Sequence, residues 1–130
     1  MRRPADVEVL GIGVDLVDVT RVERLMERHP TFTARVFTDE EIAYCERQAS
    51  PAENYAARWA AREACRKALG GVRGMRWHDV WVERARTGAP RLGLAGPVRD
   101  RAERLGVSEV KVALTHERRT AAAFCMAVGP

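Results

Sequence analysis

Cysteine, aromatic residues and long apolar runs are all scarce in this sequence of 130 residues. The three cysteines, Cys45, Cys65 and Cys125, are odd in number, far apart and without the spacing of metal ligands. Two of them stand among alanines and apolar residues, which is typical of small buried side chains in a reducing compartment. The cysteine pattern therefore favours neither a disulfide framework nor a cysteine-bound metal.

No apolar run approaches the roughly 20 residues that a helix needs to cross a bilayer. The segment Met1-Arg-Arg-Pro4 is basic, but Asp6 and Glu8 follow before any apolar core of a signal peptide. We therefore expect a cytoplasmic protein. The length predicts one domain, residues 1–130, large enough to bury roughly two-thirds of its unfolded surface.

The net charge of +4 is modest and comes mostly from arginine. This excess suits anionic partners such as nucleic acid, a nucleotide-like cofactor or an acidic protein, but it also fits ordinary solvated faces. Aromatic residues make up 6% of the chain, and none is interleaved with a basic stripe. A nucleic-acid binder is therefore the weakest of the functional hypotheses.

The strongest helix signal runs from Pro51 to Leu69. Ser50 precedes a proline at the first helical position, Glu53 can close a capping box, and Gly70-Gly71 supplies the stop. The alanines of this segment form one narrow stripe, which lets another element approach closely. The stripe consists of Ala57, Ala61, Ala64 and Ala68, flanked by Ala60 and Cys65.

The charged residues of the same helix lie outside this stripe. Arg58, Arg62 and Arg66 are predicted to share a solvated arc. Glu63 and Lys67, one turn apart at the edge of the stripe, have two interpretations. They are either a surface ion pair worth about 0.3–0.5 kcal/mol or a metal-binding carboxylate beside a phosphate-binding lysine. The helix by itself favours the ion pair.

Residues 7–14 predict a buried strand whose two glycines clear space on the face that Asp15 shares. Asp15 is either a turn-forming residue or a cation ligand, and the strand by itself favours the turn. This is not a dinucleotide fingerprint, because the third glycine is missing. One face carries Leu10, Ile12 and Val14, and the other carries Val9, Gly11, Gly13 and Asp15.

Two shorter helices are predicted before the long one, each opened by a capping box. Thr20 and Glu23 begin the first, which ends at residues 29–30. Thr38 and Glu41 begin the second, which ends at about residue 47 and whose acidic side chains look solvated. The outer face of the first helix is basic, with Arg21, Arg24 and Arg28 in line.

The late part of the chain predicts hairpins. Residues 77–84 pair with 91–95, a short helix begins at residue 96, and 109–116 pair with 120–128. The whole is an α+β domain, with an antiparallel sheet packed with the long helix. His116 ends a strand, where a structural role is the commoner one, and Glu117 is a possible partner for its imidazole.

Three blocks resemble one family. The helix segment Trp59-Ala-Ala-Arg-Glu-Ala-Cys-Arg-Lys-Ala-Leu-Gly70 resembles the signature of the 4′-phosphopantetheinyl transferases of the short holo-acyl-carrier-protein synthase type. Arg62 replaces the lysine usual in that pattern. Residues 11–18 resemble the family's amino-terminal strand, and residues 112–117 its carboxy-terminal strand pair. The blocks occur in the family's order over nearly the whole chain.

This resemblance implies transfer of the 4′-phosphopantetheine arm of coenzyme A to a serine of an apo acyl carrier protein, with release of adenosine 3′,5′-bisphosphate. Such phosphoryl transfer requires positioning and neutralisation of charge, for which Mg²⁺ is suited. The alternative is a non-catalytic relative that binds carrier protein or coenzyme A without transfer. This alternative is disfavoured because Asp15, Glu63 and Lys67 are all residue types that can serve in the transfer reaction. The sequence does not specify which carrier protein is served, nor whether its pathway is fatty-acid synthesis, polyketide synthesis or another.

The resemblance also implies residue roles and an assembly. Asp15 and Glu63 would bind Mg²⁺, and short members act as homotrimers with active sites between subunits. The catalytic candidates are Glu63, Lys67 and His116. The residues expected at coenzyme A are Arg58, Arg62, Lys67 and His116, and those expected at the carrier protein are Arg21, Arg24 and Arg28.

Overall fold

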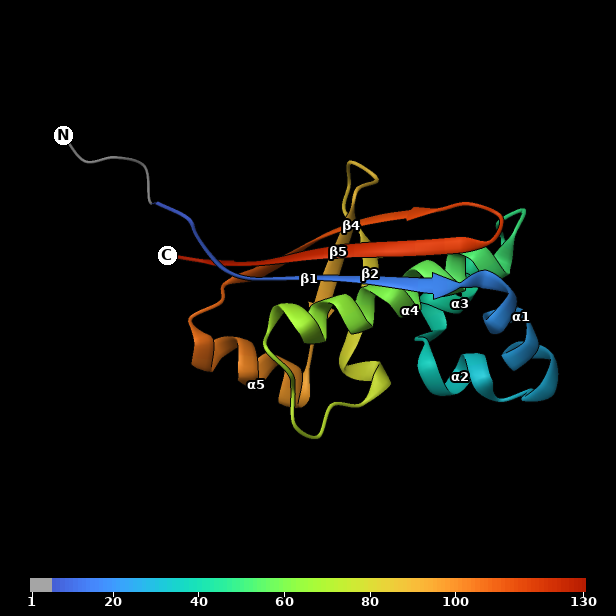
Figure 1. The fold of residues 1–130 in the computed structure, drawn as a ribbon, viewed down its shortest axis with the longest axis horizontal. Coiled ribbons are helices and arrows are strands. Elements are labelled where there is room, and N and C mark those ends of the chain that lie inside the picture. The colour runs from blue at the N-terminus through green and yellow to red at the C-terminus, as the bar shows by residue number, and fades with distance from the viewer. Residues whose placement is uncertain (1–5) are drawn as a thin grey trace.

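The computed structural model describes residues 6–130, so the basic segment Met1–Pro4 lies outside the described residues. The chain begins with one strand, continues through four helices and ends in four strands with one helix among them (Figure 1). In order these are β1 (Glu8–Asp18), α1 (Val19–Arg28), α2 (Phe32–Val36), α3 (Asp39–Glu46), α4 (Pro51–Ala68), the 3-10 turn η1 (Trp77–Asp79), β2 (Val80–Arg84), β3 (Pro90–Leu94), α5 (Gly96–Leu105), β4 (Glu109–His116) and β5 (Thr120–Gly129).

A three-stranded antiparallel sheet in the order β1-β5-β4 forms one layer, and the helices lie on one side of it (Figure 1). The first and last strands of the chain are thus neighbours, with Gly13 opposite Cys125 and Asp15 opposite Ala123. Strands β2 and β3 form a separate hairpin. The predicted α+β class, the long helix and the pairing of both late hairpins are confirmed. The predicted strand over residues 77–84 is wrong at its start, because Trp77–Asp79 form the turn η1 and β2 begins at Val80.

Helix α4 lies directly against β1. A Cβ atom added at Gly11 or Gly13 would overlap the carbonyl oxygen of Ala68 or Ala64, respectively. The space that the glycines clear is therefore filled by the backbone of α4. The alanine stripe on α4 is buried, as the sequence predicts. Ala61, Ala64 and Ala68 belong to one core cluster with small residues of β5, and Ala57 belongs to a second cluster with Ala121.

The other face of β1 differs from the prediction of a buried strand. Ile12, Val14 and Leu16 are 62%, 57% and 70% exposed, and Phe124 on β5 is 39% exposed. Alternate residues of a strand point to opposite faces, and within residues 6–130 no helix covers this second face. On the glycine face, Gly13 is buried and Gly11 and Asp15 are partly buried, but Val9 is 53% exposed, so the prediction of burial holds only where this face meets α4.

The helix starts are partly as predicted. Thr38 and Glu41 form the expected capping box of α3. Helix α1, however, is capped by Asp18, whose Oδ1 accepts from the backbone N of Thr20, so the predicted box at Thr20 is wrong. Ser50 makes no side-chain capping bond to α4.

A buried ion pair joins α3 to α4. The carboxylate of Glu41 and the guanidinium of Arg62, both fully buried, form two hydrogen bonds, one of them 3.0 Å long from Nη1 to Oε2. Glu41 also accepts from the backbone N of Val82 on β2. Burial opposes ionisation of Glu41, but the Arg62 hydrogen bonds and charge outweigh it and lower the pKa of that carboxyl. The predictions of a solvated acidic face at Glu41 and a solvated position for Arg62 are therefore wrong.

The three cysteines are free and buried, as expected. Burial raises the pKa of Cys45 and Cys65 to about 12, and it also raises that of Cys125. These thiols are therefore protonated and unreactive at neutral pH. Among the described helices, none is long and apolar enough to cross a membrane.

The contact between β1 and α4 predicts the effect of a single methyl group. Gly13→Ala should destabilise the fold by about 3 kcal/mol, because the backbone of α4 cannot move away from the sheet without disrupting the core. Chemical denaturation compared with Glu8→Ala, at the exposed start of the same strand, measures this difference. Equal stability of the two variants would contradict the packing described here.

Candidate functional site

A cavity of about 680 Å³ lies between the end of β1 and the middle of α4. Asp15 enters it from the strand, and Glu63 and Lys67 enter it from the helix. The glycine–alanine contact sets this geometry, because it holds the strand against the turn of α4 that carries Lys67. The structure thus brings Asp15 beside Glu63 and Lys67, which follow it by about fifty positions in the sequence.

The ion pairs in this cavity are not the ones that helix spacing predicts. Lys67 Nζ donates to Asp15 Oδ1 at 3.0 Å and to the carbonyl of Val14 at 3.2 Å. Glu63 Oε2 accepts from Nε and Nη2 of Arg66, at 3.0 and 2.8 Å. The simple Glu63–Lys67 surface pair is therefore not formed, and each carboxylate is neutralised by a different cation.

The donor set fits a hard divalent cation. The side chains of Asp15 and Glu63 are 18% and 26% exposed, so both carboxylates can be reached from the cavity. No group of three or more metal-binding side chains occurs in residues 6–130. Mg²⁺ is typically held by one or two carboxylates together with water and substrate phosphates. Asp15 and Glu63 would supply the carboxylates, and Lys67 would lie beside the phosphates.

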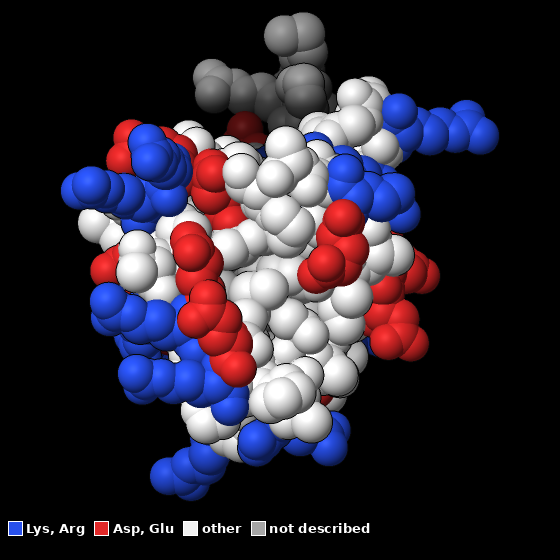
Figure 2. Space-filling view, turned by 90° about the vertical axis from the view of Figure 1, so that its right-hand side faces the viewer, with Lys and Arg blue, Asp and Glu red and all other residues white. Residues whose placement is uncertain are grey.

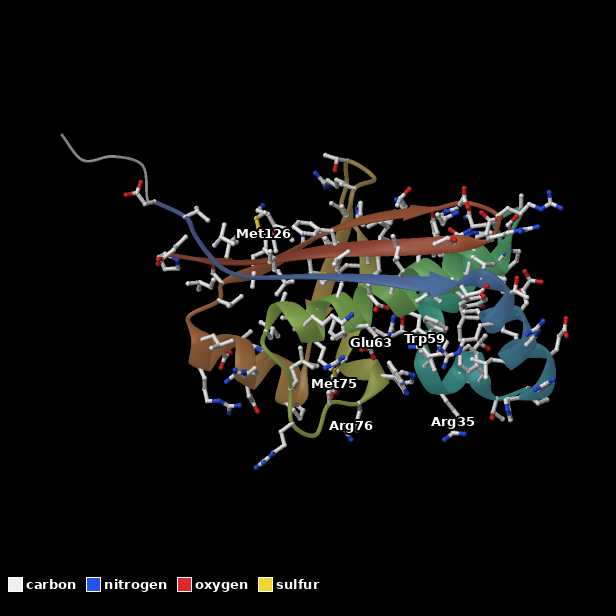
Figure 3. All side chains as sticks on the ribbon, in the orientation of Figure 1. Arg35, Trp59, Glu63, Met75, Arg76 and Met126 are labelled. Atoms are coloured by element: carbon white, nitrogen blue, oxygen red, sulfur yellow. The ribbon has the colours of Figure 1, made fainter. Side chains whose placement is uncertain are left out.

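A second cavity, of about 940 Å³, adjoins the first and is lined by α1, α2 and the segment around η1. Trp59 and Trp77 line both cavities and contact each other edge to face, with ring centroids 5.8 Å apart. Figure 3 shows Trp59 and Glu63 on the side of α4 that faces Met75 and Arg76. The sequence pattern identifies Trp59 only as part of a motif and places Trp77 at the start of a predicted strand, without a role in the site.

The predicted solvated arc on α4 is correct for Arg66, whose side chain is 40% exposed, but wrong for Arg58 and Arg62. Arg62 is bound to Glu41, so its guanidinium is not available to a coenzyme phosphate. Arg58 is 2% exposed, lies 4.3 Å from the ring centroid of Tyr44, and has no carboxylate partner in the described chain. Its Nε has no hydrogen-bond partner there either.

His116 lies at the other end of α4. Its Nδ1 forms a hydrogen bond of 3.0 Å with Oε1 of Glu53, which lowers the pKa of that carboxyl. Glu53 precedes Glu63 by ten residues, or about 15 Å along the helix axis. Glu53 and not Glu117 therefore orients the imidazole, and His116 is remote from the cavity of its own chain.

The basic residues of α1 are exposed, as predicted, and two of them line different cavities. Arg21 lies over the ring of Trp59, 5.6 Å from its centroid, and lines both cavities. Arg24 lines a groove beside Thr20 and Arg119. Figure 2 shows the end of the molecule that bears α1 and α2, where basic side chains gather along one edge beside a strip of acidic ones.

Comparisons with known proteins agree with this geometry. The family model of the 4′-phosphopantetheinyl transferase superfamily matches residues 11–125. A holo-[acyl-carrier-protein] synthase of Anaeromyxobacter dehalogenans is 46% identical over 125 residues, which cover 93% of this chain and 97% of that protein. One from Moorella thermoacetica is 42% identical over 119 residues, 91% of this chain and 93% of that protein.

A solved structure is similar over nearly the same length. The crystal structure of holo-[acyl-carrier-protein] synthase from Neisseria meningitidis matches with a TM-score of 0.82 at 30% identity, covering 92% of this chain and 98% of that one. The resemblance drawn from three sequence blocks is therefore confirmed. The chain belongs to the 4′-phosphopantetheinyl transferase superfamily, in its holo-[acyl-carrier-protein] synthase group.

Proposed function

We propose that this protein transfers the 4′-phosphopantetheine arm of coenzyme A to a serine of an apo acyl carrier protein, with Mg²⁺ held by Asp15 and Glu63. The observation that carries the proposal is the convergence of these two carboxylates and Lys67 on one cavity. Membership of the holo-[acyl-carrier-protein] synthase group supports the choice of substrates. A relative that binds without transfer would not need all three residues.

In this reaction the serine oxygen forms a bond to the phosphorus that bears the arm. The bond from that phosphorus to the adenosine 3′,5′-bisphosphate breaks, and the serine loses its proton. When bound, Mg²⁺ would neutralise charge that develops on the pyrophosphate. Lys67, which donates to Asp15 in the single chain, would offer its ammonium group to a phosphate oxygen. Glu63 is one candidate to accept the serine proton.

Arg58 is the better of the two arginine candidates for a coenzyme phosphate. A buried guanidinium without a carboxylate is costly unless an anion neutralises it. The ring of Tyr44 lies over Arg58, so binding would require Tyr44 to move. Arg62 is not part of this proposal, because its guanidinium is already paired with the carboxylate of Glu41.

The assembly we propose is a homotrimer in which neighbouring copies cover the second face of the sheet. Large exposed apolar side chains on β1 and β5 favour burial in an interface. Met126 lies on this same side of the sheet, away from the helices (Figure 3). His116 would then serve the cavity of an adjacent subunit, which would account for its distance from Glu63 in its own chain. The cytoplasmic location remains a prediction.

The metal proposal predicts the outcome of two amide substitutions. Asp15→Asn and Glu63→Gln should each reduce turnover roughly a hundredfold or more, because several kcal/mol of charge neutralisation in the transition state are lost. Transfer is followed by the mass gain of the carrier protein at a series of Mg²⁺ concentrations. Glu103→Gln, on the exposed face of α5, is the matched control. A folded Glu63→Gln variant with normal turnover would exclude the metal role.

The docking proposal predicts that charge on α1 controls association with the acidic carrier protein. Arg28→Glu should lower kcat/KM for the carrier roughly three- to tenfold at low salt, mainly through slower association, and added salt should mimic the change. Arg28 is preferable to Arg21, which also lines both cavities. Arg104→Glu on α5, at the opposite end of the molecule (Figure 1), is the matched control. Equal effects of the two reversals would place the docking surface elsewhere.

The assembly proposal predicts that one charge on the open sheet face separates the subunits. Wild type should show the mass of three chains in light scattering, whereas Ile12→Asp should be a folded monomer, because Ile12 is 62% exposed in the single chain. Transfer activity should fall with the loss of the trimer, since His116 no longer reaches a neighbouring cavity. A fully active wild-type monomer at micromolar concentration would refute the trimer.

A further inference from the structure

The segment between α4 and β2 supplies part of the wall of both cavities, yet its backbone is irregular. Three of its glycines, Gly70, Gly71 and Gly74, have positive φ. Met75 and Arg76 line the larger cavity, and Trp77 lines both. Glycine-rich backbone of this kind has many accessible conformations, so the position of Trp77 depends on contacts that hold the segment from outside.

Arg62 makes such a contact from the core. Its Nε donates to the carbonyl oxygen of Trp77 at 2.8 Å. At the start of the segment, Nε of Arg101 on α5 donates to the carbonyl of Leu69 at 3.1 Å. At its end, Asp79 accepts from the backbone N of Arg76 at 2.9 Å. Of these hydrogen bonds, only the one from Arg62 reaches the backbone of Trp77. The next residue, His78, has its Nε2 3.0 Å from the carbonyl oxygen of Ala34 on α2.

The guanidinium of Arg62 is fixed on its other side. Nη1 donates to Glu41 Oε2 at 3.0 Å and to the carbonyl of Arg58 at 3.2 Å, and Nη2 donates to Glu41 Oε1. Glu41 is held in turn by the backbone N of Thr38 and of Val82. The planar group thus spans from the buried carboxylate to the Trp77 carbonyl.

We propose that Arg62 is a positioning residue, which holds the carbonyl of Trp77 and thereby fixes the wall shared by the two cavities. The ring of Trp77 packs edge to face on Trp59, so a shift of its backbone would change both cavities at once. A lysine at this position would keep the charge beside Glu41. It would lack the fork of N–H groups that reaches the carboxylate and the carbonyl together.

The test is Arg62→Lys, with Arg99→Lys on the exposed surface of α5 as the matched control. Amide hydrogen exchange of residues 71–78 should become about tenfold faster in Arg62→Lys, the order of one hydrogen bond from a charged donor. The exchange of α4 and β5 should stay slow. An unchanged exchange rate at residues 71–78 in a folded Arg62→Lys would overturn the inference.

The kinetic consequence of this inference rests on the proposed transfer reaction. The KM for coenzyme A should rise several-fold in Arg62→Lys while kcat stays within about twofold, because the cavity wall and not the reacting groups is altered. If wild type transfers no arm, the proposed function fails, but hydrogen exchange still decides whether Arg62 positions Trp77. Arg62→Lys could show faster exchange at residues 71–78 but an unchanged KM for coenzyme A. That result would mean that Arg62 holds the segment without shaping the cavity, and it would overturn the second half of the inference.

A second variant tests the same inference if Arg62→Lys does not fold. Glu41→Gln combined with Arg62→Met removes both buried charges and keeps an acceptor for the backbone N of Val82. Replacement of a buried ion pair by groups of similar volume is commonly tolerated. This double variant also lacks the bond to Trp77, so it should show the same faster exchange at residues 71–78. Wild-type exchange there would overturn the proposal.

Discussion

The close contact between β1 and α4 is the constraint on which the rest of the structure depends. Gly11 and Gly13 meet the backbone of α4 at Ala68 and Ala64, and a methyl group at either glycine would overlap a carbonyl oxygen. Because strand and helix touch at this distance, Asp15 reaches Lys67 across the junction. A loosely packed pair of elements would leave the carboxylate of the strand and the charges of the helix too far apart to share one cavity.

The buried Glu41–Arg62 pair has a different role from the charges in the cavity. An ion pair without solvent contributes little net stability, but removal of one partner leaves an uncompensated buried charge. The geometry of this pair connects α3, α4, β2 and the carbonyl of Trp77. It therefore specifies how the elements around the cavities are arranged, whereas Asp15, Glu63 and Lys67 remain accessible for chemistry.

Two features of the single chain support the assembly proposed above. The second face of the sheet exposes large apolar side chains, including Ile12 and Leu16. His116 is held by Glu53 at the far end of α4 from Glu63. The proposed trimer would account for both, because its open faces would meet and each histidine would lie beside the cavity of a neighbour.

The sequence by itself determined the α+β class, the bounds of the long helix, the alanine stripe and the identity of Asp15, Glu63 and Lys67 as candidates. The first three follow from local periodicity and capping residues, which act over a few neighbouring residues, whereas the three candidates rest on the resemblance of their blocks to the family's motifs. Only the tertiary structure decided which charges are buried and which pair. Helix spacing gives Arg62 a solvated position, but Glu41, 21 residues earlier, accepts its hydrogen bonds inside the protein. Such partners are set by the packing of distant elements, and no local pattern records them.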